Sequence, residues 1–437
     1  MGSASRGIIS LSFSDGSDMI STWERLTLRE SFLDPLGSLS VTIRPLRKQI
    51  TEYRLKLAKG SLIKLFIDGH QQLAFVVTTI TTTIGGNGVS YDVAARSVLI
   101  TPYEGSVNPN LAKSYNSDTT VVEVVRDAML PYGFNEVVSA TSRNLKLKSG
   151  GSIPGLRNKD IKVDGLKHKD IQPQPNEKAY GFCSRIFSRV GCVLHVDAEG
   201  FLMLTYPYYE QDASYNLIQS TEPSGRSDVD RMIGNVTWTD TNDGQFSEVV
   251  VLGKSKNAKK QTRTNRPAHR VKVNDLADRE GAPFLDVPTT EIEPGWHSYG
   301  SSYGSTYKPR IVVDKRARDS ERAEIMANLL MGNQAAKAFQ VKCTVDGVVA
   351  STGRIWTINT IANVKMLIFQ TESGATFNED MWILERTITA NREGGQQTQL
   401  TLIPKYSLVL GKIPDGVARP KSKPKGSRYK KIRSEVG

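Results

Sequence analysis

The chain of 437 residues is longer than one hydrophobic core normally organises, so we expect two to four domains. An apolar content of 38% and a charged content of 23% are ordinary for a folded soluble protein, and no run approaches the ~18 apolar residues that span a bilayer. The formal net charge of +12 raises nucleic acid as a partner, but the basic excess is concentrated at 254–270 and 412–433, in segments that read as a loop and a tail.

A first β-barrel domain is predicted over 1–105, composed of strands and turns alone. Runs such as 23–28 and 38–43 alternate apolar and polar residues, and a turn sequence, AspProLeuGly, lies between them at 34–37. Strands this short and this regularly spaced indicate a barrel or a small sandwich. The glycine-rich segment 83–88 is interpreted as a hairpin turn, because no helix start follows it as a phosphate site would require.

A middle α+β domain is predicted over 106–232. Its first helix is expected at 117–131, where Ser117 or Asp118 can serve as the N-cap and Pro131 ends the helical pattern.

The helix-hairpin unit 175–206 lies in this middle domain. Phe182, Ile186 and Val190 recur every four positions, which predicts an amphipathic helix that Gly191 ends. The period then becomes two along both strands of a hairpin. The apolar residues of these strands are Cys192, Leu194, Val196, Leu202, Leu204 and Tyr206, and the helix residues expected to face away from them are Lys178, Ser184, Arg185 and Arg189. We therefore expect the helix and the hairpin to bury each other.

A second β-barrel domain is predicted over 233–411. It is expected to contain an insertion at 254–310, which is basic and then rich in Gly, Ser and Tyr, and a helix at 320–338. Alternating strands resume after that helix. The remaining residues, 412–437, form a basic C-terminal tail with too few apolar side chains to fold alone.

The order of features in 175–206 resembles that of a known protein family. ProAsnGlu precedes a helix that contains ArgIlePheSerArg near its end, a glycine and an apolar strand follow, and AspAlaGluGly connects to a second apolar strand. This order is similar to the middle domain of the baseplate central hub proteins of Mu-type contractile-tail bacteriophages. Their superfamily includes the late-control D proteins and the hub portion of the type VI secretion spike. The resemblance extends in order over 8–105, 117–232 and 320–405.

The resemblance implies a structural protein of the virion tail baseplate, assembled in the host cytoplasm. It implies a homotrimeric adaptor that joins the sixfold tail tube to the threefold central spike and lets DNA pass through its ring without specific binding. The expected partners are the central spike protein, the tail tube protein and baseplate wedge proteins, with the tape-measure protein as a further candidate. No enzymatic activity, cofactor or membrane insertion is expected, and the N-terminus has no apolar core of signal-peptide length.

The two β regions show the same order of strand signals. Gly60 opens an apolar strand in the first, and Gly353 is expected to open one in the second; ThrIleThr follows at 79–81 and again at 387–389. This order predicts two similar β-barrel domains around the interposed α+β domain, although two unrelated β domains with similar hairpins would give the same signals. Three copies of such a chain would form a trimeric ring with pseudo-sixfold symmetry.

Signals for catalysis or metal binding are weak. Cys183 and His195 are residue types of a thiol nucleophile and its base, but Cys183 lies on the apolar side of a helix, and Cys343 also reads as a core residue. The five histidines are scattered, and the cysteines lack CxxC spacing. The cluster Asp228, Asp230, Asp240 and Asp243 lacks the spacing of a calcium loop and is interpreted as turn and cap residues. We therefore predict no catalytic, metal or cofactor site.

The basic tail is the candidate partner-binding segment. Its candidate residues are Lys421, Lys423, Lys425, Arg428, Tyr429, Lys430, Lys431 and Arg433. Such a run is typical of a solvated tail, and equally of a segment that becomes ordered against an acidic partner.

Three other functions remain open from the sequence. The chain could be a hub component of a type VI or related contractile injection system, although no spike repeats follow residue 411. A tail-associated peptidoglycan hydrolase would use carboxylates that a sequence alone does not locate. A basic nucleic-acid-binding protein would show a steep dependence of DNA binding on salt.

Overall fold

The structure of the chain is a computed structural model, and it divides into two compact units. The first is Met1–Asp240 with Phe339–Ile403, and the second is Thr241–Ala338 with Pro404–Gly437. The residues described are 7–13, 19–20, 23–86, 88–111, 120–139, 145–146, 152–153, 172–187, 192–198, 200–205, 207–209, 211–219, 229–240, 248–253, 269–274, 291–292, 296–297, 309–314, 330, 336–337, 339–367, 376–392, 395–405 and 407–408. Within these ranges, no helix is long and apolar enough to cross a membrane.

Alternating sequences form the strands of the first β region, as predicted. These strands are β1 (Ile9–Phe13), β2 (Met19–Ile20), β3 (Trp23–Ser31), β4 (Ser38–Ile43), β5 (Leu62–Ile67), β6 (His70–Gly85) and β7 (Gly88–Ser97). They are hydrogen-bonded in the order β2-β1-β5-β6-β7-β4-β3, each antiparallel to its neighbour. Because side chains alternate between the two faces of a strand, residues such as Leu26, Leu28 and Val41 gather in one buried core.

The second β region is a closed barrel of six strands. They are β13 (Tyr215–Ile218), β14 (Asp230–Asp240), β20 (Phe339–Asp346), β21 (Ile361–Leu367), β22 (Thr376–Asn391) and β23 (Gly395–Pro404). The order is β13-β21-β22-β23-β20-β14, and β14 pairs again with β13 to complete the circle. β13 is parallel to both of its neighbours, whereas β14, β20 and β23 are successively antiparallel. Closure gives each of these strands a neighbour on both sides, although β13 covers β14 only at Asp230 and Arg231.

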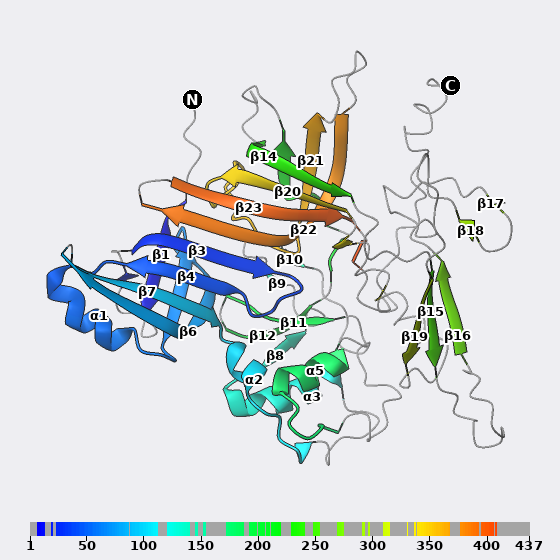
Figure 1. Cartoon of the computed structure of the whole chain (residues 1–437), viewed down its shortest axis with the longest axis horizontal. Helices are drawn as coiled ribbons and strands as arrows, with labels where there is room; N and C mark the ends of the chain where they lie inside the picture. Colours follow the sequence, from blue (N-terminus) through cyan, green and yellow to red (C-terminus); the bar gives the residue numbers. More distant parts are fainter. Residues whose placement is uncertain are drawn as a thin grey trace. The chain divides into compact units, whose positions relative to one another are not determined.

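The long strand β22 joins the two β regions (Figure 1). Its first half, Thr376–Trp382, pairs with β21, and its second half, Glu385–Asn391, pairs antiparallel with β3. In that second half, Ile388 and Ala390 belong to the core of the first β region rather than to the barrel. The two β regions are therefore one continuous sheet with a shared strand.

The two β regions repeat the same strand order. Taken in chain order, β1, β3, β4, β5, β6 and β7 correspond to β13, β14, β20, β21, β22 and β23, and the pairing orders given above are then identical. The first region differs in three respects. β1 is antiparallel to β5, whereas β13 is parallel to β21, and β2 adds a strand beyond β1. The outer edge of β3 also pairs with β22, so the described pairings do not close this region on β1.

The backbone repeats in detail where the long strand begins to turn. The Gly60 N–H donates to the Val77 carbonyl at 2.9 Å, and the Val77 N–H donates to Ser61. In the second region, the Asn359 N–H donates to the Ile383 carbonyl at 3.0 Å, and the Ile383 N–H donates to Thr360. Gly60 and Asn359 share the left-handed backbone conformation, with φ of +85° and +60°.

This equivalence corrects the repeat predicted from the sequence. The expected strand at 353–358 does not form, because Ile355 makes only an isolated bridge with Val349. The counterpart of Gly60 is Asn359 rather than Gly353, and the counterpart of β5 is β21. Val77 and Ile383 are 306 positions apart in the sequence, as are the ends of the two long strands, Gly85 and Asn391. With this equivalence, the ThrIleThr segment at 387–389 lies two residues further along its strand than the segment at 79–81. The pattern favoured the tripeptide match, whereas the backbone hydrogen bonds define the register.

The middle region contains helices over a small sheet. The helices are α2 (Ile100–Glu104), α3 (Val121–Met129), η3 (Leu130–Tyr132) and α5 (Ala179–Phe187); the strands are β8 (Val137–Ser139), β11 (Val193–Val196) and β12 (Leu202–Thr205), in the order β11-β12-β8, and β9 (Leu145–Lys146) pairs with β10 (Ser152–Ile153). Phe182, Ile186, Leu194 and Leu204 share one buried core. The predicted helix-hairpin unit is thus confirmed over its described residues; Arg189, Val190, Gly191 and Tyr206 lie outside them.

Three local predictions are wrong. The first region is not strands and turns alone, because η1 (Arg47–Gln49) and α1 (Ile50–Lys56) follow β4, and α1 buries Tyr53. The N-cap of α3 is Thr120, whose hydroxyl accepts from the Glu123 N–H while the Glu123 carboxylate accepts from the Thr120 N–H. Arg185 is not solvent-facing, because its guanidinium pairs with Glu177 at 2.8 Å with both side chains largely buried.

The second unit contains two small sheets. β15 (Glu248–Gly253) lies between β16 (His269–Asn274) and β19 (Pro309–Asp314), and β17 (Glu291–Ile292) pairs with β18 (Trp296–His297). Of the helix predicted at 320–338, residues 330, 336 and 337 are described and helical. The larger part of this unit, Thr241–Ala338, lies in the sequence between β14 and β20. The equivalent strands of the first region, β3 and β4, are connected by the six-residue loop 32–37.

Candidate functional site

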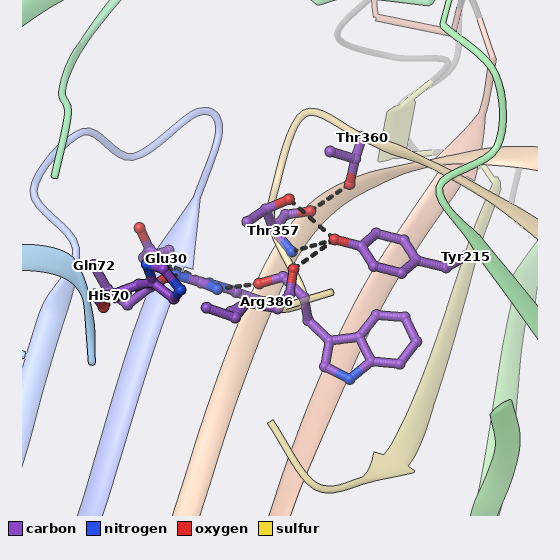
Figure 2. A network of polar contacts seen from close by, with 9 residues as sticks. Glu30, His70, Gln72, Tyr215, Thr357, Thr360 and Arg386 are labelled. Atoms are coloured by element: carbon purple, nitrogen blue, oxygen red, sulfur yellow. Dashed lines mark hydrogen bonds and ion pairs between the residues drawn. The ribbon is translucent and has the colours of Figure 1, made fainter. Parts of the chain in front are cut away.

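A buried cation lies where β22 joins β3. The Arg386 side chain is 1% exposed, and its Nε and Nη2 atoms contact the Glu30 carboxylate on β3. Its Nη1 donates to the Trp356 carbonyl, and its Nη2 also lies 3.4 Å from the Gln72 side-chain oxygen on β6. Figure 2 shows the guanidinium of Arg386 between these groups. A buried charge is tolerated only when it is paired and hydrogen-bonded, and here the partners come from β3 and β6 of the first β region and from the segment before β21 in the second.

A second polar group continues the network on the barrel side. The Tyr215 hydroxyl, from β13, lies 2.6 Å from the Ile355 carbonyl and 3.1 Å from the Thr357 hydroxyl, and it accepts from the Thr357 N–H. The Thr360 hydroxyl donates to the Thr357 carbonyl, and the Tyr215 ring packs on Trp356 with centroids 4.5 Å apart. Burial raises the pKa of Tyr215, against the opposing effects of Thr357 and Arg386. The hydroxyl is therefore a neutral donor that holds the 355–360 segment.

This network is suited to holding the two β regions together rather than to catalysis. The Arg386 guanidinium is fully enclosed, and it donates to the Glu30 carboxylate and to the Trp356 carbonyl. Figure 2 shows it directed at Glu30. Gln72 likewise turns its side-chain N–H to the His70 carbonyl at 3.2 Å. A substrate would have to displace these internal partners, at the cost of leaving a buried charge unpaired. We refer to Arg386, Glu30, Gln72 and Trp356 as the buried junction.

Sequence reasoning missed the buried junction, although a signal for it was present. Leu26 and Leu28 lie on the inward face of β3, and Glu30 is two residues further along the same face. Arg386 stands in the same relation to Ile388 on β22. Two opposite charges at inward positions of two predicted strands therefore indicated a buried pair, but only the fold shows that the strands are neighbours.

The residues considered for thiol catalysis have structural roles. Burial raises the pKa of Cys183 far above its usual range, and it raises the pKa of Cys192 and Cys343 to about 12. A thiol with so high a pKa supplies almost no thiolate nucleophile at neutral pH. A ring nitrogen of His195 lies 3.0 Å from the Phe32 carbonyl, which ties the hairpin of the middle region to the first β region.

The aspartate cluster does not form a metal site over the residues that the structure describes. Asp230 accepts from the Ser351 N–H at 2.8 Å and contacts the Ser351 hydroxyl at 3.1 Å, which fixes the turn after β20. Asp230 and Asp240 are themselves the end residues of the strand β14. Desolvation raises the pKa of this carboxyl. Asp228 and Asp243 lie outside the described residues, and within them no group of three potential metal ligands occurs.

The candidate residues of the basic tail, Lys421 to Arg433, all lie outside the described residues.

The described surface offers a different feature, the outer half of the β6–β7 hairpin. From Thr79 to Gly85, the side chains of β6 are exposed on both faces except for the half-buried Ile80, and Ile84 is 79% exposed. A ribbon with two exposed faces is an unusual place for β-branched residues, which normally pack against a covered surface.

Comparison with solved structures shows which proteins share this fold. A tail protein from Neisseria meningitidis MC58 matches with a TM-score of 0.64 and 17% sequence identity, over 91% of this chain and 98% of that one. The 43 kDa tail protein of prophage MuSo2 from Shewanella oneidensis matches with a TM-score of 0.62 and 15% identity, over 92% and 99% of the two chains. No protein-family model matches the sequence, and a search of curated proteins gave no match. The similarity to Mu-type tail proteins predicted from the sequence is therefore confirmed as a similarity of fold.

The buried junction predicts that replacing glutamate by glutamine lowers the free energy of unfolding more at Glu30 than at Glu385. Glu30→Gln leaves the buried Arg386 charge without its counter-charge, so we expect a loss of about 3–5 kcal/mol of unfolding free energy. Glu385→Gln is the matched control on the facing strand: Glu385 lies 3.8 Å from Arg29, and these side chains are 30% and 64% exposed, so a loss of at most ~1 kcal/mol is expected. Urea denaturation followed by tryptophan fluorescence measures both. Equal losses would contradict the role given to the buried junction.

Proposed function

We propose that this chain, which has the fold of the two prophage tail proteins, is a structural component of a contractile phage tail and acts as the baseplate central hub. The observation that carries the proposal is the extent of the match, which covers more than nine tenths of this chain and almost the whole of each tail protein. A match of that extent includes both β regions and the middle region, rather than one common barrel. A location in the virion tail follows from the proposed role.

The finer proposal is a trimeric adaptor between tube and spike. Its physical basis is the repeated strand order of the two β regions, held in one fixed arrangement by β22 and the buried junction. Three such chains in a ring present six similar β units, which can match a sixfold tube on one side, while the three chains match a threefold spike on the other. The lumen of the ring would let DNA pass without sequence-specific contact. The proposed partners are the spike, the tube and the baseplate wedge proteins, with the tape-measure protein as a further candidate.

The proposed role is non-enzymatic. The buried junction is enclosed, and the raised pKa values of the three cysteines argue against thiol chemistry. Two alternative functions that the sequence leaves open can each be tested directly. A peptidoglycan hydrolase would clear a suspension of purified cell wall, and a hub of a type VI or related injection system would assemble with a spike of that system rather than with a phage spike.

The native mass of the purified chain tests the adaptor. We expect a species of about 145 kDa, three times the chain mass of 48.2 kDa, in light scattering or native mass spectrometry over a concentration series. The trimer fraction should increase with concentration, because association of three chains follows mass action. A chain that stays monomeric at every concentration, with and without a spike partner, would contradict the trimeric adaptor.

We further propose that the basic tail binds an acidic surface of a neighbouring tail component. Deleting 412–437 removes a run of lysines and arginines and leaves the described core of both β regions unchanged. We therefore expect the truncated chain to keep its melting temperature and its native mass. Its amount in purified tail particles should decrease relative to the full chain, as measured by quantitative mass spectrometry. Undiminished incorporation would show that the tail is only a solvated extension.

A further inference from the structure

We infer that the outer half of β6 of one chain pairs with β14 of a second copy, as the outer half of β22 pairs with β3 inside one chain. The inference rests on the homotrimer of the proposed function, and it adds the strands, the register and the residues of the joint between copies. It follows from the repeat and from one strand edge that has no neighbour among the described strands.

The first observation is the open edge of β6. β5 pairs with β6 as far as Val76, where Leu62 is the partner, and β7 pairs with the opposite edge of β6 as far as Gly85. Among the described strands, no neighbour follows β5 along the edge from Thr79 to Gly85. In the equivalent strand β22, this half of the edge is the one that pairs with β3, over Glu385–Asn391. The edge that is covered within the chain in one repeat thus has no described strand beside it in the other.

The second observation is the chemistry of this edge. The segment from Thr79 to Gly85 has the sequence ThrIleThrThrThrIleGly, which contains no charge and no proline and has a high β-propensity. Proteins normally protect an open edge with a lysine, a proline or a bulge because such an edge otherwise pairs with another chain. The one bulge here, at Thr78, precedes the open half and does not interrupt it. An unprotected edge of this composition is suited to strand pairing.

The third observation identifies the partner strand. β3, which covers β22, corresponds to β14 in the second repeat. β14 has β20 as a neighbour along its length and β13 at Asp230 and Arg231. Its segment Asn235–Thr239, with the sequence AsnValThrTrpThr, is also uncharged. The repeat therefore supplies both halves of a second joint, and the internal joint already fixes the two β regions of one chain, so the second joint is left for another copy.

Register follows from the positions that the repeat equates. Leu28 pairs with Leu39 in β4, which pairs with Ala95; Trp238 pairs with Val341 in β20, which pairs with Leu402. β7 begins at Gly88 and β23 begins at Gly395, and both glycines have a positive φ. Taking these two glycines as equivalent makes Ala95 equivalent to Leu402. Through the pairings just given, Leu28 is then equivalent to Trp238. Within the chain Leu28 faces Ile388, the counterpart of Thr82. The inferred joint therefore places Thr82 opposite Trp238, and Thr83 opposite Thr237.

Exposure supports this register. In the joint within the chain, the inward residues Leu28 and Ile388 are fully buried. In the single chain, Trp238 is 37% exposed and Ile84 is 79% exposed. Trp238 already packs on Phe339 and Phe377, with ring centroids 4.7 and 5.2 Å apart. In the inferred register Ile80 and Ile84 are diagonal neighbours of Trp238, within reach across a strand pair, so the joint would cover this aromatic group.

The joint between copies differs from the internal joint in one respect. Ile80 occupies the position in β6 that Arg386 occupies in β22, because each lies three residues beyond the equivalent residues Val77 and Ile383. The buried ion pair is therefore not repeated between copies. We expect a joint that forms by backbone pairing and apolar contact and that dissociates on dilution, whereas the internal joint persists until the chain unfolds.

Cysteine cross-linking tests the joint. The double variant Thr83→Cys, Thr237→Cys places two thiols directly opposite each other on adjacent copies, where a disulfide fits. We expect mild oxidation to give covalent dimers and trimers on a non-reducing gel. The native cysteines give little background, because all three are buried. The negative control is Thr82→Cys, Thr237→Cys, whose side chains point to opposite faces of the paired strands.

A positive control comes from the internal joint. Thr27 and Thr389 are directly paired, and they are the counterparts of Thr237 and Thr83. The variant Thr27→Cys, Thr389→Cys should form a disulfide within one chain under the same conditions. If this control closes and the native mass is trimeric, but Thr83→Cys, Thr237→Cys gives no cross-link between chains, the inferred joint is wrong and the trimeric adaptor stands. A monomeric mass without cross-links would contradict both.

Discussion

The buried ion pair between Arg386 and Glu30 is the constraint on which the arrangement of the two β regions depends. A guanidinium enclosed in a protein core requires a counter-charge and hydrogen-bond acceptors, and this one takes them from β3 and from the turn before β21. Separating the β regions would expose or orphan that charge. The surrounding apolar residues, among them Leu28 and Ile388, add burial that any separation would also lose. The chain therefore presents its two β regions at one fixed geometry.

A ring-forming adaptor requires a fixed geometry between its two similar β regions. The repeat of strand order gives each β region the same potential neighbours, and β22 satisfies one such pairing inside the chain. The second unit of the chain departs from the barrel between β14 and β20, where the first repeat has only a short loop. This position lets one repeat carry a large addition without interrupting the strand order. The two repeats can thus differ in the chain between these two strands while they keep the same strand order.

Much of the local structure could be predicted from the sequence, but the junction could not. The helix-hairpin unit was predictable because Phe182 and Ile186 follow a helical period and Leu194 and Leu204 follow a strand period, and the core they form is local. The strand expected at 353–358 is instead a turn region, held by the Tyr215 hydroxyl from 140 residues away in sequence. Distant partners of this kind leave no periodic signal.

The helix α1 was missed for a related reason. It is only seven residues long and buries a single side chain, Tyr53, so it offers too few positions for a period to be recognised. The N-cap of α3 shows the opposite case, because Thr120 and Glu123 match the capping box, a signal readable from sequence that the choice of Ser117 or Asp118 overlooked. Local chemistry was thus sufficient for the helix ends, and long-range pairing was required for Glu30 and Arg386.

Electron microscopy of the purified assembly would show directly whether both β regions line the lumen. We expect a closed ring with threefold symmetry in which six similar β lobes alternate around the lumen, three from each of the two β regions. A particle of trimeric mass that shows only three lobes around the centre, with the other β region outside the ring, would contradict it.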